Sequence, residues 1–200
     1  MYKIYTLNTD TLSLDKIEEI SIERRKKLDS FFFEKDKKLS LGASILLDKM
    51  LREYNLREKD MIYSYNKYGK PYFKNHPEIK FNLSHCENMC MLVSSTKDIG
   101  CDIEKIRNYD VDIVKRCFSK DEEETINNSL DKNYLFTLIW TCKEAFFKNI
   151  GTGLSDDIQK ISINILKDKI SVKQFISNKN YVFTTSRIDN YLLTICEEEN

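Results

Sequence analysis

Acidic side chains with strand spacing stand near the middle of the chain. In Gly100-Cys101-Asp102-Ile103-Glu104 the two acids lie two residues apart, so a strand places both carboxylates on one face, with Cys101 and Ile103 facing the core. Adjacent carboxylates repel each other, and a hard divalent cation such as Mg²⁺ relieves that repulsion. The spacing favours a metal site at a strand end, although two solvated acids would give the same short pattern.

A second chemically rich segment runs from Trp140 to Lys148. Trp140, Glu144 and Lys148 recur every four residues, so a helix stacks them on one face. An acid and a base one turn apart are often an ordinary surface ion pair. Here they share their face with a Trp and precede the flexible sequence Gly151-Thr152-Gly153, which favours a functional site.

The first half of the chain contributes basic and polar candidates. Residues 24–38 hold seven basic and three acidic side chains. This pattern fits either a solvated helix face or a surface that captures a polyanion. Phe81-Asn82-Leu83-Ser84-His85 ends a predicted strand with polar groups. His85 could donate to a phosphate or could be an ordinary structural histidine.

The composition indicates a chain with a sizeable core. Its 200 residues are 41% hydrophobic with 5 Gly and 2 Pro, which excludes collagen-like and Pro/Gly-rich disordered chains. No stretch suits a membrane span, and the first residues lack a signal peptide. The 32 basic and 32 acidic residues give no net charge, which disfavours a nucleic-acid binder. We expect the six cysteines to be reduced in a cytoplasmic protein.

The hydrophobic pattern predicts an α+β protein. We expect helices at 14–29, 34–54, 110–117, 119–128 and 131–149. We expect strands at 2–7, 61–65, 79–83, 89–95, 99–104, 158–165, 169–176, 180–186 and 191–196. No linker-like stretch occurs, so we expect two tightly joined α+β domains, 1–98 and 99–200.

Five segments, taken in order, resemble one enzyme family. They are the basic segment from residue 24, Tyr68-Gly69-Lys70-Pro71, Phe81-Asn82-Leu83-Ser84-His85, Gly100-Cys101-Asp102-Ile103-Glu104, and residues 140–148. Their order and spacing resemble the 4′-phosphopantetheinyl transferases of the surfactin-synthetase-activating (Sfp) type, over residues 24 to 155. Lys38 departs from the pattern, since relatives often carry arginine there.

The resemblance implies an intramolecular pseudodimer. Two similar α+β halves would each pack a helix on a mostly antiparallel sheet, with coenzyme A in the cleft between them. The implied coenzyme A contacts are Arg24, Lys27, Lys38, Lys70, Pro71, Ser84 and His85. Four of them would hold the 3′-phosphate, namely Arg24, Lys27, Lys38 and His85. The implied ligands of Mg²⁺, with Mn²⁺ as the alternative, are Asp102, Glu104 and Glu144.

The implied reaction is transfer of 4′-phosphopantetheine from coenzyme A to a serine of an acyl or peptidyl carrier protein, as in holo-[acyl-carrier-protein] synthase. The other product is 3′,5′-ADP. Glu144 is the expected general base, directly or through a water, and Lys148 would neutralise the phosphates or the leaving group. Lys115 and Arg116, beside Val114 and Phe118, would meet an acidic carrier helix. We expect a monomer.

Two other functions fit parts of the sequence. Asp102, Glu104 and Glu144 could serve a two-metal nuclease or nucleotidyltransferase, but zero net charge disfavours nucleic-acid affinity. A non-catalytic module that binds coenzyme A or a carrier would need a lost metal ligand, and all three acids are present. P-loop, dinucleotide-binding, hydrolase and zincin motifs do not occur.

Overall fold

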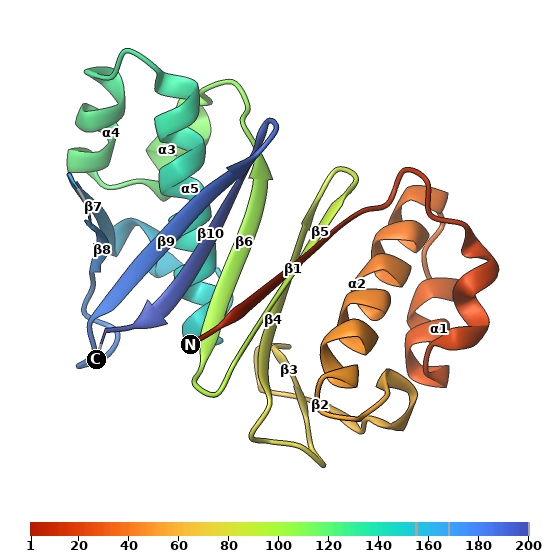
Figure 1. The fold of residues 1–200 in the computed structure, drawn as a ribbon. Coiled ribbons are helices and arrows are strands. Elements are labelled where there is room, and N and C mark those ends of the chain that lie inside the picture. The colour runs from red at the N-terminus through yellow and green to blue at the C-terminus, as the bar shows by residue number, and fades with distance from the viewer. Residues whose placement is uncertain (155, 168, 200) are drawn as a thin grey trace. The chain divides into compact units, whose positions relative to one another are not determined.

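The computed structural model describes residues 1–154, 156–167 and 169–199. Its internal contacts divide the chain into two compact units, Met1–Lys97 and Asp98–Asn200, both drawn in Figure 1. Within the described residues, no helix is both long and apolar enough to cross a membrane.

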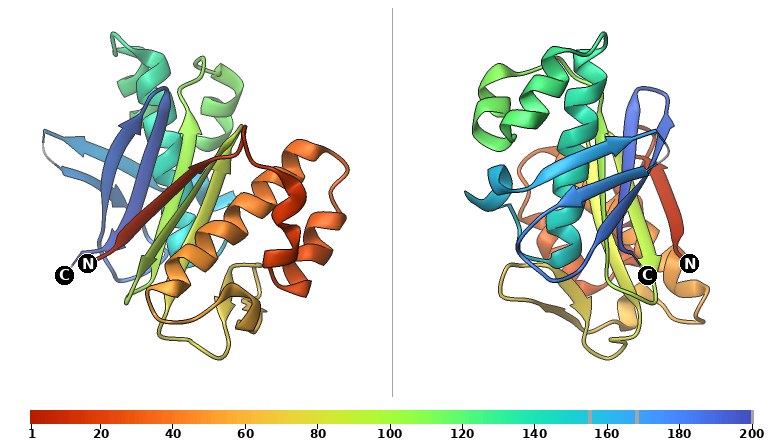
Figure 2. Two further views of the ribbon diagram at one scale, coloured as in Figure 1. Left: turned by 45° about the vertical axis from the view of Figure 1, so that its right-hand side comes forward. Right: turned by 90° about the vertical axis from the view of Figure 1, so that its left-hand side faces the viewer.

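The first unit packs a long helix on a three-stranded antiparallel sheet. The strand order is β1-β5-β4, formed by Lys3–Asn8, Met89–Ser95 and Lys80–Cys86. Helix α2 (Glu34–Arg52) covers the sheet, and α1 (Ile22–Asp29) lies beside α2 (Figure 2). The remaining elements are η1 (Leu14–Glu19), η2 (Glu58–Asp60) and the hairpin β2–β3 (Tyr63–Tyr65 and Pro71–Phe73). Apolar side chains of α2 and the sheet form its core.

Ser21 divides the helix that the sequence predicts at 14–29. Its hydroxyl caps α1 by accepting from the Arg24 N–H at 3.3 Å. The backbone N–H and the hydroxyl of Ser21 also donate to the buried Glu58 carboxylate, at 2.7 and 2.8 Å. The start of α1 is therefore fixed to η2, and the preceding residues form the separate η1.

The second unit packs another long helix on a five-stranded antiparallel sheet. The strand order is β6-β10-β9-β8-β7, formed by Ile99–Lys105, Tyr191–Glu198, Tyr181–Ile188, Lys169–Lys173 and Ser162–Leu166. Helix α5 (Lys132–Ile150) packs on β6 and β10 (Figure 2). The remaining elements are α3 (Val111–Cys117), α4 (Lys120–Asn127) and η3 (Asp156–Lys160). A core rich in Phe side chains, including Phe136, Phe146 and Phe147, lies under α5.

The predicted α+β class is confirmed, and so is the repeated arrangement of one long helix on an antiparallel sheet. Two further details differ from the prediction, besides the divided helix at 14–29. The segment expected as a strand at 158–165 begins as η3 and becomes a strand only at Ser162. The three-residue β3 was not predicted, because its pattern is too short for alternation to be recognised.

Candidate functional site

Asp102 and Glu104 lie on the face of β6 that α5 covers. Their neighbours Cys101 and Ile103 are fully buried on the other face, as strand alternation requires. Asp102 is in the middle of the strand and only 3% exposed. The expected position at a strand end is therefore wrong for Asp102, and so is the alternative of a solvated acid, because α5 packs over it.

One face of α5 presents three side chains toward these acids. The Lys148 ammonium lies 2.7 Å from Asp102 Oδ1. One turn before Glu144, the Trp140 indole N–H points to Glu104 Oε1 at a longer 3.4 Å. The spacing of Trp140, Glu144 and Lys148 places all three on one face of α5, as the sequence predicts, and that face lies against β6.

Gly100 lets α5 approach β6 closely enough for these contacts. A Cβ atom at this position would lie 2.0 Å from the Ala145 carbonyl oxygen and 2.5 Å from the Asn149 backbone nitrogen. No side chain fits such a gap. Asn149 then ties the end of α5 to the sheet, because its amide donates to the Cys196 carbonyl at 2.8 Å.

The charges on this face shift the protonation of two groups. Burial raises the pKa of Glu144 to about 7, opposed by the Lys148 charge and reinforced by the negative charges of Asp102 and Glu104. Burial, the largest single effect, works to lower the pKa of Lys148, but its acidic neighbours, Asp102 foremost and Glu144 among the others, together outweigh burial, so the pKa is raised. Glu144 can therefore exchange a proton near neutral pH, while Lys148 stays cationic.

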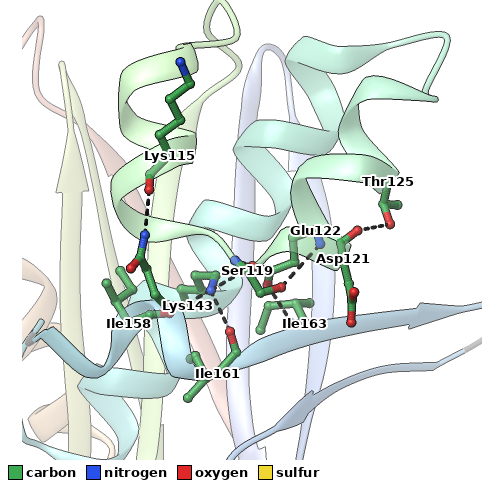
Figure 3. A network of polar contacts seen from close by, with 10 residues as sticks. Lys115, Ser119, Asp121, Glu122, Thr125, Lys143, Ile158, Ile161 and Ile163 are labelled. Atoms are coloured by element: carbon green, nitrogen blue, oxygen red, sulfur yellow. Dashed lines mark hydrogen bonds and ion pairs between the residues drawn. The ribbon is translucent and has the colours of Figure 1, made fainter.

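Lys143, the residue before Glu144, points the other way and locks α5 to its neighbours (Figure 3). Its fully buried ammonium donates to the carbonyls of Ile158 and Ile161 at 2.8 and 2.9 Å and pairs with Glu122 at 2.9 Å. Glu122 also accepts from the Ile163 N–H at 2.7 Å and closes the capping box of α4. This network fixes α5 against α4, η3 and β7.

Three carboxylates here have the chemistry of Mg²⁺ ligands. Within the part of the chain that the structure describes, no three His, Cys, Asp or Glu side chains already converge as a metal-binding group. Lys148 instead provides the cation beside Asp102. The negative charges of Asp102 and Glu104 nevertheless help to raise the pKa of Glu144, and a divalent cation would remove this repulsion. The residues fit the ion chemically, and a bound cation would compete with Lys148 for Asp102.

Arg107, which the sequence analysis did not single out, also borders this site. Its guanidinium lies 5.5 Å from the Trp140 ring centroid and 5.3 Å from that of Phe136. Its charge counteracts the rise in the pKa of Glu144. The sequence could have indicated Arg107 by its position, since it lies three residues after Glu104 and just beyond the end of β6.

The first unit contains a separate cavity of about 260 Å³. Phe81, Leu83 and His85 reach it from one face of β4, and Gly69 and Pro71 from the hairpin. The other lining residues come mainly from α1 and α2, and they are Arg24, Lys27, Phe31, Asp36, Leu39, Ser40, Ala43, Leu47, Tyr63 and Tyr65. We call this the α2–β4 pocket.

Arg24 is the buried cation of the α2–β4 pocket, with only 8% of its surface exposed. Its Nε donates to Ser44 Oγ at 2.8 Å and its Nη2 to the Ser40 carbonyl at 3.2 Å. Lys27 lies one turn along α1 and is more exposed to solvent. Partial burial lowers the pKa of Lys27, and the Arg24 charge lowers it further.

The pocket gathers Arg24, Lys27, Pro71 and His85 but not the other three predicted coenzyme A contacts. Lys38 borders a different hollow, next to Thr9 and Asn88, and pairs with Glu34 at 3.0 Å. Ser84 is buried on the opposite face of β4 from His85. Lys70 lies between two lining residues, and its backbone is held by Asn66.

The expected carrier-binding surface on α3 needs correction. Val114 and Phe118 are 1% and 4% exposed and belong to the core of the second unit. They cannot offer apolar contacts to a partner, because the apolar stripe of α3 packs inward. Lys115 and Arg116 are exposed, as expected, and Val111 is 45% exposed.

Comparisons with known proteins find the same enzyme family for both halves of the chain. The family model described as 4′-phosphopantetheinyl transferase superfamily matches residues 98–196, and the one described as 4′-phosphopantetheinyl transferase, N-terminal, matches residues 11–97. The 4′-phosphopantetheinyl transferase Sfp of Bacillus subtilis (strain 168) is 30% identical, over 97% of this chain and 91% of its own length.

Two other relatives differ in the names they carry. The 4′-phosphopantetheinyl transferase ffp of Bacillus subtilis is 29% identical, over 88% of this chain and 81% of its own. The L-aminoadipate-semialdehyde dehydrogenase-phosphopantetheinyl transferase of Candida glabrata is 27% identical, over 77% of this chain and 66% of its own length. An α+β chain with this charged helix–strand site thus has transferases as its relatives. The chain belongs to the 4′-phosphopantetheinyl transferase superfamily, which confirms the resemblance seen in its motifs.

Proposed function

We propose that this chain transfers the 4′-phosphopantetheine group of coenzyme A to a serine hydroxyl of an acyl or peptidyl carrier protein and releases 3′,5′-ADP. The observation that carries the proposal is the charged set between β6 and α5, Asp102, Glu104, Glu144 and Lys148. Membership of the superfamily supports the reaction class. With an acyl carrier protein as acceptor, the activity is that of a holo-[acyl-carrier-protein] synthase.

The α2–β4 pocket is the proposed site for the nucleotide end of coenzyme A. Arg24, Lys27 and His85 supply positive or proton-donating groups for the 3′-phosphate. Pro71 contributes apolar surface for the nucleotide, and we place Lys70 and Ser84 at its border. Lys38 pairs with Glu34 beside the other hollow, so its predicted phosphate contact lacks support.

The charged set of the second unit is the proposed site of chemistry. Glu144 accepts the proton of the carrier serine, directly or through a water. Its pKa of about 7 without a metal suits that task near neutral pH; a metal held by Glu144 would lower this pKa and favour the route through a water. The serine oxygen then attacks the β-phosphorus, and the bond to the 3′,5′-ADP oxygen breaks. Lys148 stabilises the charge that the leaving group gains. Mg²⁺ or Mn²⁺, when held by Asp102, Glu104 and Glu144, would supply further charge neutralisation at the pyrophosphate.

The carrier contact is proposed for the exposed side of α3, where Lys115 and Arg116 flank an acidic partner and Val111 adds apolar area. All six cysteines are present as thiols, which suits a reducing compartment such as the cytoplasm.

An intact-mass assay tests the function. The protein is incubated with coenzyme A, Mg²⁺ and an apo-carrier protein, and the carrier is weighed by mass spectrometry. A gain of one phosphopantetheine group supports the transferase. Binding of coenzyme A without a gain in mass would leave only a binding module, and cleavage of nucleic acid would favour the nuclease alternative.

A further inference from the structure

Glu58 is a buried acid beside the α2–β4 pocket. The residue is 0% exposed, and among the described residues no Lys, Arg or His nitrogen pairs with its carboxylate within 4.0 Å. Three neutral donors satisfy it instead. Its Oε2 accepts from the Ser21 N–H at 2.7 Å, and its Oε1 accepts from the Ser21 hydroxyl at 2.8 Å and from the Tyr63 phenol at 2.6 Å. Burying a charge is costly, so an acid kept here without a cation requires an explanation.

The three donors join Glu58 to two walls of the pocket. Ser21 caps α1, the helix from which Arg24 and Lys27 reach the pocket. Tyr63 begins β2 and lines the pocket itself. Burial, followed by the charge and the hydrogen bond of Glu58, raises the pKa of Tyr63, so the phenol keeps its proton and continues to donate. Glu58 is not one of the described lining residues, so it can act on a ligand only through these neighbours.

The position of α1 depends strongly on this contact. Ser21 Oγ donates to Glu58 and accepts from the Arg24 N–H at 3.3 Å, which links the carboxylate to the first turn of the helix. Negative charge near a helix N-terminus stabilises the helix. Because α1 has only eight residues, it is too short to be stable without such tertiary support.

We propose that Glu58 is a positioning residue for coenzyme A binding, which holds α1 and Tyr63 in the arrangement that the ligand requires before the ligand arrives. This inference rests on the proposed function, in which the α2–β4 pocket receives the nucleotide end of coenzyme A. A pocket with ordered walls avoids the entropy loss of ordering them on binding. Glu58 should therefore affect the affinity for coenzyme A and not the chemical step, which we assign to the second unit.

The alternative is that Glu58 only stabilises the first unit. Asp48 on α2 offers a matched comparison, because it is another acid that holds η2. It accepts from the Glu58 backbone N–H at 3.1 Å and from the side chains of Arg52 and Arg57 at 2.7 and 2.9 Å. None of these three partners lines the described pocket. A purely structural role predicts the same kinetic effect for both acids.

The test measures steady-state carrier modification at varied coenzyme A. Glu58→Gln keeps the size of the side chain and removes its charge, Ser21→Ala removes one donor, and Asp48→Asn is the control. We expect Glu58→Gln and Ser21→Ala to raise the apparent coenzyme A constant about tenfold, with turnover at saturation within about twofold of wild type. Asp48→Asn should change neither constant by more than about twofold. Ser21→Thr keeps the hydroxyl and should behave like wild type.

Melting temperatures of the ligand-free proteins separate stability from positioning. Glu58→Gln and Asp48→Asn should both melt below wild type, so that lost stability alone cannot explain different coenzyme A constants. Ser21→Ala is the milder change and keeps the test decisive if Glu58→Gln does not fold. An unchanged coenzyme A constant in Glu58→Gln and Ser21→Ala, or an equal rise in Asp48→Asn, would overturn the positioning role and leave the transferase intact. A wild-type protein that converts no carrier would overturn the proposed function, and this inference with it.

Discussion

The ion pair between Asp102 and Lys148 lies beside Glu144, and both of its charges affect the pKa of Glu144. Lys148 keeps its charge because Asp102 and the other acidic neighbours together outweigh the effect of burial on its pKa. Glu144 feels both the cation and the two acids of β6, and its pKa rises to about 7. A surface Glu–Lys pair would show neither burial nor this coupling, so the side chains of this face form a buried, electrostatically coupled cluster rather than a solvated one.

Lys148→Met should lower turnover by more than tenfold while changing the apparent coenzyme A constant much less. The lysine acts most strongly when negative charge builds up on the leaving group, and such an interaction lowers the barrier. Steady-state rates at fixed Mg²⁺ and varied coenzyme A measure both constants. A turnover number within twofold of wild type would reduce Lys148 to a partner of Asp102.

Glu144 should make the metal-free protein less stable as the pH rises. Its pKa is about 7 in the folded chain against 4.5 when exposed. Between these values the folded state binds more protons than the unfolded state, so stability falls as the pH increases through that window. Melting temperatures measured in chelator from pH 5 to pH 8 should therefore drop more for wild type than for Glu144→Gln.

Added Mg²⁺ provides the companion measurement. A cation held by the carboxylates should raise the wild-type melting temperature at pH 8, and raise that of Glu144→Gln less. Parallel pH profiles for the two proteins, or equal responses to Mg²⁺, would contradict the assignment of Glu144.

The position of α5 decides whether these side chains meet. Gly100 allows the helix to touch β6, and Lys143 fastens its opposite side to α4, η3 and β7. The predicted helix at 131–149 is close to the observed one, since its apolar spacing is long and regular. The burial of Asp102 was not predictable, because it depends on how closely a helix distant in sequence packs.

Gly100→Ala should displace α5 from β6. The added Cβ would sit 2.0 Å from the Ala145 carbonyl oxygen, so backbone must move, at a cost of about 1–3 kcal/mol or more. We expect a lower melting temperature together with a loss of turnover, because Lys148 would no longer reach Asp102. A variant that is as stable and active as wild type would show that the close approach is dispensable.

Lys143→Met should destabilise the second unit without touching the charged face of α5. It leaves Glu122, which is 2% exposed, as a buried acid without its cation, and breaking such a pair costs about 3–5 kcal/mol. Urea unfolding measures the loss, and the double variant Lys143→Met with Glu122→Gln should regain part of it. A loss below about 1 kcal/mol in the single variant would mean that the pair contributes little.

Across the whole chain, each unit carries a different part of the proposed reaction. The cations and the cavity lie in Met1–Lys97, and the carboxylates with Lys148 lie in Asp98–Asn200. The sequence shows the same division, with 18 basic against 15 acidic residues in 1–100 and 14 against 17 in 101–200. The excess of each sign matches the ligand that we assign to each unit.

Residue spacing predicted which side chains share a face at the charged set of β6 and α5 better than it predicted which residues line the α2–β4 pocket. Strand and helix periods fix which of residues 100–104 and 140–148 share a face, so those candidates could be read from spacing. On α2, neighbouring residues point about 100° apart. That rotation places Ser40 at the α2–β4 pocket and Lys38 at another hollow. A count of basic residues along the sequence does not show on which side of the helix each residue lies.

The rate of holo-carrier formation by wild type and Asp102→Asn tests the central claim most directly. The substitution keeps the size of the side chain and removes the charge that holds Lys148 and would hold a metal. Intact carrier mass is followed over time at saturating coenzyme A and Mg²⁺, with circular dichroism to establish folding. We predict steady conversion by wild type and a loss of about a hundredfold or more in the folded variant. No mass gain with wild type, or equal rates for both proteins, would contradict the account.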